Sequence, residues 1–299
     1  MLSILIPVYN FDIKVLVTEL HRQAMNEKIP FEILVLDDAS DKDIYNNSEI
    51  SNLQNVKYSV LTKNIGRSKI RNVLSSKAKF PYLLFLDCDA SVSSNSYIHS
   101  YVKQCKNEVV VCGGTGYENS SNFSNHRNDY ILRLNYGFKR ETKTAYERNQ
   151  NPNNCFSSFN FMISKSILER ISFDETITQY GHEDTLFGLE LKRNNIIITH
   201  IENPLNHIGL DTNSVFISKA LSSVRNLYTI LNRGFYTKDL NNDIKLLRYY
   251  STLKFFGLTP IFSILYKITQ RSLKRNLINK GNNLFYFDML RLGFLCSLG

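Results

Sequence analysis

Short apolar runs alternate with amphipathic segments over the first ninety residues. Residues 12–26 and Arg67–Ala78 have the 3.6-residue apolar spacing of helices. Strand-length apolar runs occupy Leu2–Val8, Glu32–Leu36, Val56–Leu61 and Tyr82–Leu86. Short strands separated by amphipathic helices predict βαβ units, and therefore an α/β fold whose central sheet is mostly parallel and flanked by helices. This part of the chain is expected to form a Rossmann-like half.

The pattern is less regular from about residue 96 to residue 210. Polar segments at 118–126 and 140–155 are expected to be loops. Further strands are expected at Val109–Cys112, Phe159–Ile163 and Ile196–Ile201, and further helices at 127–138, after Ser164 and at Glu183–Arg193. We therefore predict one catalytic domain over 1–210, made of a nucleotide-binding half at 1–95 and an acceptor half at 96–210.

The remaining segment, 211–299, is expected to be a helical extension. Residues 214–232 and 243–256 have helical spacing. The apolar run Phe255–Tyr266 is too short to cross a bilayer, and it suits a hydrophobic hairpin or an interfacial segment. Lys267–Lys280, which follows it, holds five bases and no acid.

Charge separates the two parts of the chain. The formal net charge is +9. Residues 1–200 hold 23 bases and 22 acids, whereas 201–299 hold 13 bases and 5 acids. A nucleic-acid binder would be basic throughout its binding domain, so no nucleic-acid partner is expected. The distribution predicts a body that acts on small molecules and a tail that meets an anionic membrane surface or packs on the body.

Cysteine usage and the first residues of the chain bear on location. The five cysteines include no C-x-x-C pair and their number is odd, which is typical of reduced thiols. The N-terminal segment lacks the basic region and cleavage site of an export signal. These features predict a cytoplasmic protein, with the tail allowing peripheral association at the inner face of the cell membrane.

Acidic residues follow two of the predicted strands. Asp37 and Asp38 come after the second strand, and Asp87 and Asp89 come after the fourth. Ligands of open parallel sheets bind beyond the carboxyl ends of the strands. Two carboxylates that converge there repel each other unless a cation lies between them. The pattern favours Mn²⁺ or Mg²⁺ shared with a diphosphate, although such acids also cap helices.

Cations open the helix that follows Asn64-Ile65-Gly66. Arg67 and Arg71 lie one turn apart, where positive charge opposes the helix dipole. This placement favours a ligand anion such as a diphosphate, and a solvated basic face is the alternative.

The combination of these motifs resembles the family 2 glycosyltransferases of the GT-A fold. The strings that carry the resemblance are Ser3-Ile4-Leu5-Ile6-Pro7-Val8-Tyr9-Asn10, Asp37-Asp38-Ala39-Ser40, Asn64-Ile65-Gly66-Arg67 with Arg71-Asn72, Asp87-Cys88-Asp89 and Gly181-His182-Glu183-Asp184. The resemblance extends to about residue 210. It implies inverting transfer of a sugar from a UDP-sugar to a saccharide or lipid-linked saccharide acceptor, in surface polysaccharide or glycan biosynthesis.

The resemblance also implies roles for single residues. Pro7, Tyr9 and Asp38 would hold the uracil and ribose of the donor, and Asn64, Gly66 and Arg71 belong to the same donor site. Asp89 would ligate the metal ion directly, Asp87 would contact the ribose or the metal, and His207 would be a further metal ligand.

The acid pair Glu183-Asp184 would act on the acceptor. Asp184 is the implied general base for the acceptor hydroxyl, and Glu183 the implied positioning residue. Both open a predicted helix, whose dipole is expected to stabilise their anionic form. Because the leaving group is a diphosphate, one base and one metal site suffice for the reaction.

Other functions compete with this interpretation. A sugar-phosphate nucleotidyltransferase would need a glycine-rich loop after the first strand, where this chain has Tyr9-Asn10-Phe11-Asp12. The second alternative is a non-catalytic membrane-surface protein, or scaffold, with a glycosyltransferase-like fold. Release of UDP from candidate donors separates these possibilities.

Overall fold

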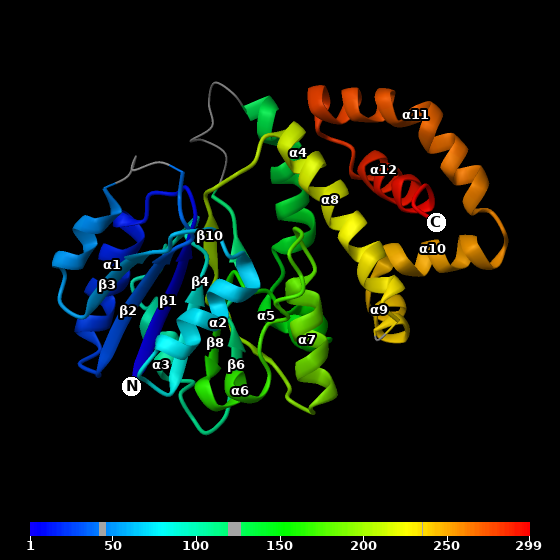
Figure 1. Ribbon diagram of the computed structural model, residues 1–299. Coiled ribbons are helices and arrows are strands. Elements are labelled where there is room, and N and C mark those ends of the chain that lie inside the picture. Colours follow the sequence, from blue (N-terminus) through cyan, green and yellow to red (C-terminus); the bar gives the residue numbers. More distant parts are fainter. Residues whose placement is uncertain (42–45, 119–126, 235) are drawn as a thin grey trace. The chain divides into compact units, whose positions relative to one another are not determined.

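The computed structural model describes residues 1–41, 46–118, 127–234 and 236–299 (Figure 1). These residues form two compact units. The first comprises Met1–Glu118, Thr142–Thr178 and Glu183–Gly209, and the second comprises Asn119–Glu141, Gln179–His182 and Leu210–Gly299. The unit boundary at Gly209 lies next to the predicted one, but two earlier segments belong to the second unit. All but Glu118 of the predicted loop 118–126 lies outside the described residues.

A seven-stranded sheet forms the centre of the first unit within the described residues. Its strand order is β3-β2-β1-β4-β8-β6-β9. The strands are β1 (Leu2–Val8), β2 (Phe31–Asp37), β3 (Val56–Val60), β4 (Tyr82–Leu86), β6 (Val110–Cys112), β8 (Asn160–Ser164) and β9 (Thr199–His200). Strands β1 to β4 pair in parallel, with Leu2 opposite Phe31 and Tyr82. The predicted fold class, a mostly parallel sheet flanked by helices, is confirmed.

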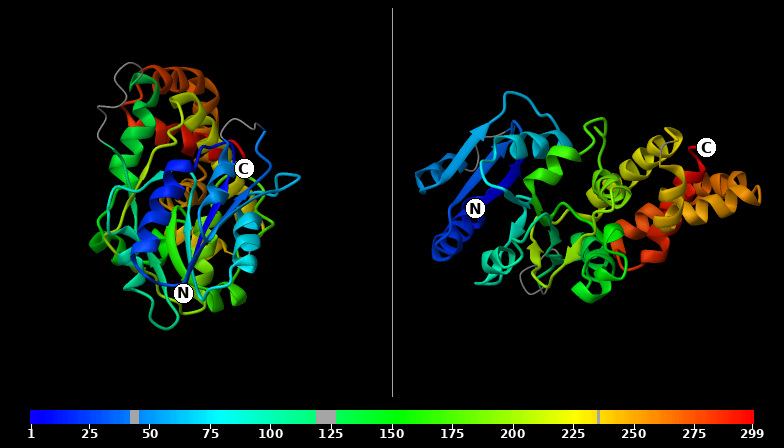
Figure 2. Two further views of the ribbon diagram at one scale, coloured as in Figure 1. Left: turned by 90° about the vertical axis from the view of Figure 1, so that its left-hand side faces the viewer. Right: turned by 90° about the horizontal axis from the view of Figure 1, so that it is seen from below.

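Helices cover both faces of this sheet, as the two views of Figure 2 show for α1 and α2. Alternate residues of β1 explain the arrangement. Ile4 and Ile6 face α1 (Lys14–Asn26) and α3 (Tyr97–Val102). Leu5 faces the core on the opposite side of the sheet. The opposite core contains residues of α2 (Arg67–Lys77), α6 (Lys165–Arg170) and α7 (Glu183–Arg193). The two-residue side-chain period of a strand thus builds two separate cores.

One strand runs against its neighbours and brings a loop to the site. β8 is antiparallel to β4, with Asn160 opposite Leu86. The start of β8 therefore lies at the same sheet edge as the end of β4, where Asp87 follows. The sequence predicted this strand but not its direction.

A second, three-stranded sheet lies beside this edge. β10 (Leu205–His207) pairs antiparallel with β5 (Ala90–Ser91) and parallel with β7 (Thr115–Gly116). His207 stands opposite Ala90, the residue after Asp89. Residues distant in sequence are thereby brought together.

Two segments of the first unit differ from expectation. The polar stretch 140–155 contains α5 (Ala145–Asn149), and the 3₁₀ turn Asn153–Cys155 follows it. Thr144 and Glu147 form a capping box at the start of α5, a Thr-x-x-Glu signal that the sequence displays. The expected strand Ile196–Ile201 is reduced to β9. A further 3₁₀ turn, Asn47–Asn52, precedes β3.

The second unit is helical. Its helices are α4 (Arg127–Tyr136), the π-helix Gly137–Glu141, α8 (Asn213–Asn232), α9 (Thr237–Asp243), α10 (Lys245–Phe255), α11 (Thr259–Lys280) and α12 (Leu284–Cys296). Leu132, Ile217 and Phe287 join α4, α8 and α12 in one core. No helix among the described residues is both long and apolar enough to cross a membrane.

Candidate active site

Asp38, which follows β2, holds the loop that leads into α2. Its side chain is buried, and its two oxygens accept hydrogen bonds from the backbone N–H groups of Ile65 (2.7 Å) and Gly66 (3.0 Å). Gly66 has a φ of +84°, a conformation that favours glycine. The predicted donor residues Asp38 and Gly66 are thus held in one hydrogen-bonded loop.

The other predicted donor residues lie around the carboxyl ends of β1 and β2. Tyr9 is 45% exposed, and its hydroxyl donates to Asp41 Oδ2 at 2.9 Å. Pro7 is half-buried within β1, and Asn64 is exposed. An exposed aromatic ring at a sheet edge is available to stack on a base.

Arg71 differs from its predicted role as an accessible diphosphate ligand. Its side chain is only 2% exposed, and its Nη2 donates to Asp87 Oδ1 at 2.6 Å. The charge that seemed misplaced at the start of α2 is explained by this buried ion pair. Arg67, one turn earlier, remains half-exposed.

Asp89 and His207 form the second pair at this edge. Asp89 Oδ2 lies 3.0 Å from His207 Nε2. The rings of Tyr117 and Phe159 pack edge-on against the imidazole, with centroids 5.8 and 5.4 Å away. Burial acts to raise the pKa of Asp89, but the hydrogen bond and charge of His207 outweigh it and leave that pKa lowered. The carboxylate is therefore ionised at neutral pH.

These contacts bear on the residues predicted to ligate the metal ion. Asp87 and Asp89 have separate partners here, in contrast to the predicted convergence on one cation. No group of three or more His, Cys, Asp or Glu side chains is gathered for a metal in the described part of the chain. A carboxylate and an imidazole in contact still suit Mn²⁺ or Mg²⁺, because these ions keep water and substrate phosphate oxygens among their ligands. Asp89 and His207 therefore fit the metal, and Asp87 fits less well.

Gly209 presses against this pair. A Cβ atom on Gly209 would lie 2.5 Å from Asp89 Cβ and 2.9 Å from Asp89 Oδ2. We expect Gly209→Ala to displace the Asp89 carboxylate and to weaken UDP binding in the presence of Mn²⁺ by about 10–100-fold, the usual cost of disturbing the support of a metal ligand. Calorimetry measures this, and the affinity with chelator present is the internal control. Unchanged Mn²⁺-dependent affinity would contradict the predicted role of Asp89.

Asp184 lies in the first turn of α7, as predicted. Its Oδ2 accepts from the backbone N–H of Ser158 at 3.1 Å. Its Oδ1 is buried, and no donor among the described residues lies within hydrogen-bond distance of it. Burial and then the charge of Glu183 raise the pKa of Asp184 to about 6, against smaller lowering effects of Arg71 and Ser158. The helix dipole, expected to stabilise the anion, is outweighed by burial.

Glu183 is buried at the start of the same helix. Its Oε1 lies 3.5 Å from Nη1 of Arg67. This contact joins the start of α7 to the start of α2. Glu183, the predicted positioning residue, is therefore itself held by Arg67 of the Asn64-Ile65-Gly66-Arg67 motif.

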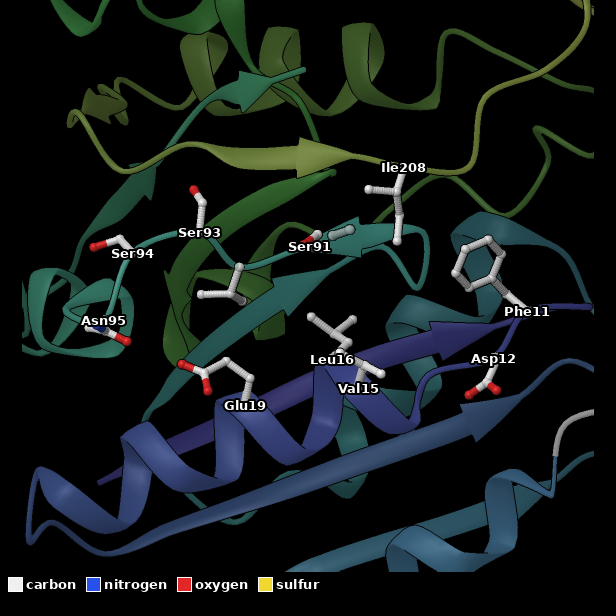
Figure 3. Close-up of a pocket in the computed structure, with 12 residues that line it drawn as sticks. Phe11, Asp12, Val15, Leu16, Glu19, Ser91, Ser93, Ser94, Asn95 and Ile208 are labelled. Atoms are coloured by element: carbon white, nitrogen blue, oxygen red, sulfur yellow. The ribbon is translucent and has the colours of Figure 1, made fainter. Parts of the chain in front are cut away.

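A cavity of about 390 Å³ lies between α1 and the strands β5 and β10 (Figure 3). Phe11, Val15 and Ile208 provide apolar walls, and Asp12, Glu19 and Ser91 provide polar ones. Pro7, Tyr9, Asp38, Asn64, Gly66, Arg71, Asp87, Asp89, Glu183, Asp184 and His207 are all missing from its lining. This cavity is therefore distinct from the predicted donor site.

Sequence reasoning missed several supporting residues. Ser158 contributes a backbone N–H, for which no side-chain signal exists. Phe159 and Tyr117 flank His207 only because β8 and β7 bring them there. Asn160 accepts hydrogen bonds from the hydroxyls of Tyr97 and Tyr101 at 2.7 Å each, and these bonds connect β8 to α3. No sequence motif predicted this contact.

Comparison with known proteins identifies the family of the chain. The family model described as Glycosyl transferase family 2 matches residues 3–172, more than half of the chain. Chondroitin synthase of Pasteurella multocida (strain Pm70) is 26% identical over 220 residues, which cover 64% of this chain and 23% of that protein. The chain thus spans about a quarter of the length of this relative.

Two solved structures are similar to this chain. The mannosyltransferase PcManGT from Pyrobaculum calidifontis, in complex with GDP-Man and Mn²⁺, has a TM-score of 0.57 at 13% identity, covering 99% of this chain and 85% of that one. Residues 1–349 of S. aureus TarS give a TM-score of 0.49 at 19% identity, covering 97% of this chain and 89% of that one. The family match leads to one conclusion: the chain is a glycosyltransferase that belongs to glycosyl transferase family 2.

Proposed function

We propose that the chain transfers a sugar from a UDP-sugar to a hydroxyl of a saccharide or lipid-linked saccharide, with inversion at the anomeric carbon and with Mn²⁺ or Mg²⁺ bound. The state of Asp184 is the observation that carries this proposal. A carboxylate with a pKa of about 6, and with a buried oxygen that has no hydrogen-bond partner among the described residues, is suited to accept a proton near neutral pH.

The donor site is proposed at the carboxyl edge of β1, β2 and β4. Tyr9 and the loop held by Asp38 lie there, and Asp89 and His207 would hold the metal ion. When bound, the metal supplies a Lewis acid for the diphosphate leaving group. The Mn²⁺ and GDP-Man in the mannosyltransferase complex are consistent with a metal and a nucleotide-sugar donor. The choice of UDP follows from the motif resemblance.

The chain's own residues would handle the acceptor proton. Asp184 Oδ1 would take the proton from the acceptor hydroxyl. At the same time the hydroxyl oxygen forms a bond to the anomeric carbon, and the bond between the anomeric carbon and the diphosphate breaks. Glu183, held by Arg67, would orient the acceptor beside it. Direct displacement of this kind converts an α-linked donor into a β-linked product.

The acceptor is proposed to be a saccharide because the similar protein from Pasteurella multocida is a chondroitin synthase. We further propose work in surface polysaccharide or glycan biosynthesis, at a cytoplasmic location. The family match favours a glycosyltransferase over a nucleotidyltransferase, and the intact Asp89 and Asp184 favour an enzyme over a scaffold.

A panel of nucleotide-sugars tests the proposal. Each is incubated with the full chain and Mn²⁺, and free UDP or GDP is measured with and without oligosaccharide acceptors. We expect one UDP-sugar to release UDP, faster with acceptor, and chelator to stop it. Turnover of a GDP-sugar alone, or turnover that survives chelation, would overturn the donor or the metal assignment.

The pH dependence follows from Asp184. A general base must be unprotonated, so kcat/KM for the acceptor should rise as pH increases through about 6 and level off above about 7. The profile is measured with the donor and Mn²⁺ saturating. A rate that is flat from pH 5 to pH 8, or that falls with pH, would contradict this assignment.

A further inference from the structure

An exposed apolar corner joins α10 to α11 in the second unit. α10 ends at Phe255, and Phe256, Gly257 and Leu258 lead into α11 (Figure 1). Gly257 has a φ of +67°, which permits the sharp change of direction. Phe255 is 84% exposed and Phe256 is 66% exposed. Adjacent aromatic side chains left in water are unusual, and a contiguous apolar patch of this kind marks an interaction surface.

α11 extends this surface along one face. Ile261, Ile264, Leu265 and Ile268 follow the spacing i, i+3, i+4, i+7, and all four are exposed. The other side of α11 carries Tyr266 and Leu277, which are buried in the core with Phe287 and Leu290 of α12. The exposed stripe is therefore additional to the face with which α11 packs.

Positive charge accompanies the patch. Arg271 and Arg275 continue the exposed stripe by one and two turns. From residue 244 to residue 287 the chain holds eight bases and no acid. An exposed apolar stripe followed by exposed bases offers the two contacts that bind a helix to an anionic membrane surface, which are apolar burial and attraction to the anionic headgroups.

We propose that this surface, here named the α10–α11 corner, inserts its apolar side chains into the interface of an anionic lipid bilayer. It comprises Phe255, Phe256, Ile261, Ile264, Leu265, Ile268, Arg271 and Arg275. The phenylalanines and isoleucines reach the acyl chains, and the arginines meet the headgroup phosphates. The apolar run is too short to span the bilayer, so the corner lies on it.

Charge favours lipid over a second copy of the chain. Two copies that met through this face would bring the same bases together, and like charges across an interface are repulsive. An anionic bilayer offers negative charge and apolar depth at once. The corner contains none of the residues proposed for donor, metal or acceptor, so membrane binding and sugar transfer can fail independently.

Flotation of the full chain with vesicles tests the proposal. Vesicles of phosphatidylcholine alone are compared with vesicles that contain phosphatidylglycerol, at low and at high salt. We expect binding only to the anionic vesicles, and weaker binding at high salt because the charges are screened. Phe255→Ser/Phe256→Ser should abolish flotation. Arg271→Gln/Arg275→Gln should weaken it about 25-fold, since each base near such a surface contributes about fivefold.

Matched variants elsewhere serve as controls. Ile197→Ser removes an exposed apolar side chain from the first unit, and Lys103→Gln/Lys106→Gln removes two exposed bases. Both should float like the wild type. The corner variants should keep the wild-type melting temperature and UDP affinity, because their side chains are exposed and none of them is a proposed donor residue.

Several outcomes would overturn the proposal. These are no flotation at low salt, equal flotation with neutral vesicles, or flotation that the corner variants leave unchanged. A marked loss of melting temperature in Phe255→Ser/Phe256→Ser would mean that the corner packs against protein. A dimer in light scattering that the same variant dissolves, without vesicle binding, would assign the corner to self-association.

Discussion

Asp184→Asn is expected to lower kcat for sugar transfer by about 10²–10⁴-fold, the usual contribution of a general base. The amide keeps the shape of the side chain and can still accept from the N–H of Ser158, but it takes no proton from the acceptor. UDP affinity in the presence of Mn²⁺ should stay near wild type. Transfer to an acceptor is the measurement, and a variant that keeps more than a tenth of wild-type kcat would rule out Asp184 as the base.

The same variant should be more stable than the wild type at neutral pH. The pKa of Asp184 in the folded chain is about 6, above its ordinary value of 3.8. A raised folded pKa contributes stability that is complete below 3.8 and is lost as pH rises through 6. Ionised Asp184 therefore costs about 1–3 kcal/mol at pH 7.5, and asparagine removes that cost. Thermal unfolding at pH 7.5 and pH 4 measures it, and a variant less stable than wild type at pH 7.5 would contradict the burial argument.

Two variants of α7 separate chemistry from structure. Glu183→Gln should raise the acceptor KM more than it lowers kcat, if Glu183 positions the acceptor. Glu190→Gln changes a more exposed carboxylate on the same helix and should leave both constants unchanged. Equal losses of activity in Asp184→Asn, Glu183→Gln and Glu190→Gln would indicate a general disturbance of α7.

Asp89→Ala is expected to abolish the part of UDP affinity that depends on Mn²⁺. The contact between Asp89 and His207 provides the carboxylate and imidazole that would hold the metal, and alanine leaves only the imidazole. His207→Ala should lower the Mn²⁺-dependent affinity by at least about 10–100-fold. Calorimetry with UDP, with Mn²⁺ or with chelator, measures both, and affinities that Mn²⁺ still raises in Asp89→Ala would exclude this metal site.

Asp87→Ala provides the contrast within the same motif. Because Arg71 is buried and donates to Asp87, this variant leaves a guanidinium without its carboxylate. Breaking a fully buried pair costs about 3–5 kcal/mol, and because Asp87 is half-buried we expect a smaller but clear loss of stability. Asp89→Ala, whose partner is a histidine, should have a smaller effect on stability. Urea unfolding compares the two.

Apolar periodicity predicted the elements that build the sheet and its first helices. The bounds of β1, β4 and α7 agree with their predicted ranges because each combines a clear apolar pattern with a clear polar boundary. The order of acidic and basic motifs also predicted that Asp38, Asp87 and Asp89 share one sheet edge, since carboxyl ends of parallel strands share an edge. Local spacing carries this information.

Contacts between segments distant in sequence determined the features that the apolar pattern did not predict. Arg71 resembled a ligand for an anion until packing buried it against Asp87. The polar stretch 140–155 resembled a loop, although Thr144 and Glu147 signalled the helix that forms there. The direction of β8 depends on its partners β4 and β6, and the nearer of these, β6, ends at Cys112, 48 residues before β8 begins at Asn160. No local pattern encodes it.

The chemistry of the site shows the same division. Three features can be read from the residues alone: which acids are present, that Asp184 opens a helix, and that positive charge collects after residue 210. Folding was needed to place Asp184, with its buried Oδ1, beside Glu183, to bring Asp89 to His207, and to leave the apolar side chains around Phe255 in water. Burial and charge proximity set the pKa values and metal affinity of a group, and both arise from segments that only folding brings together.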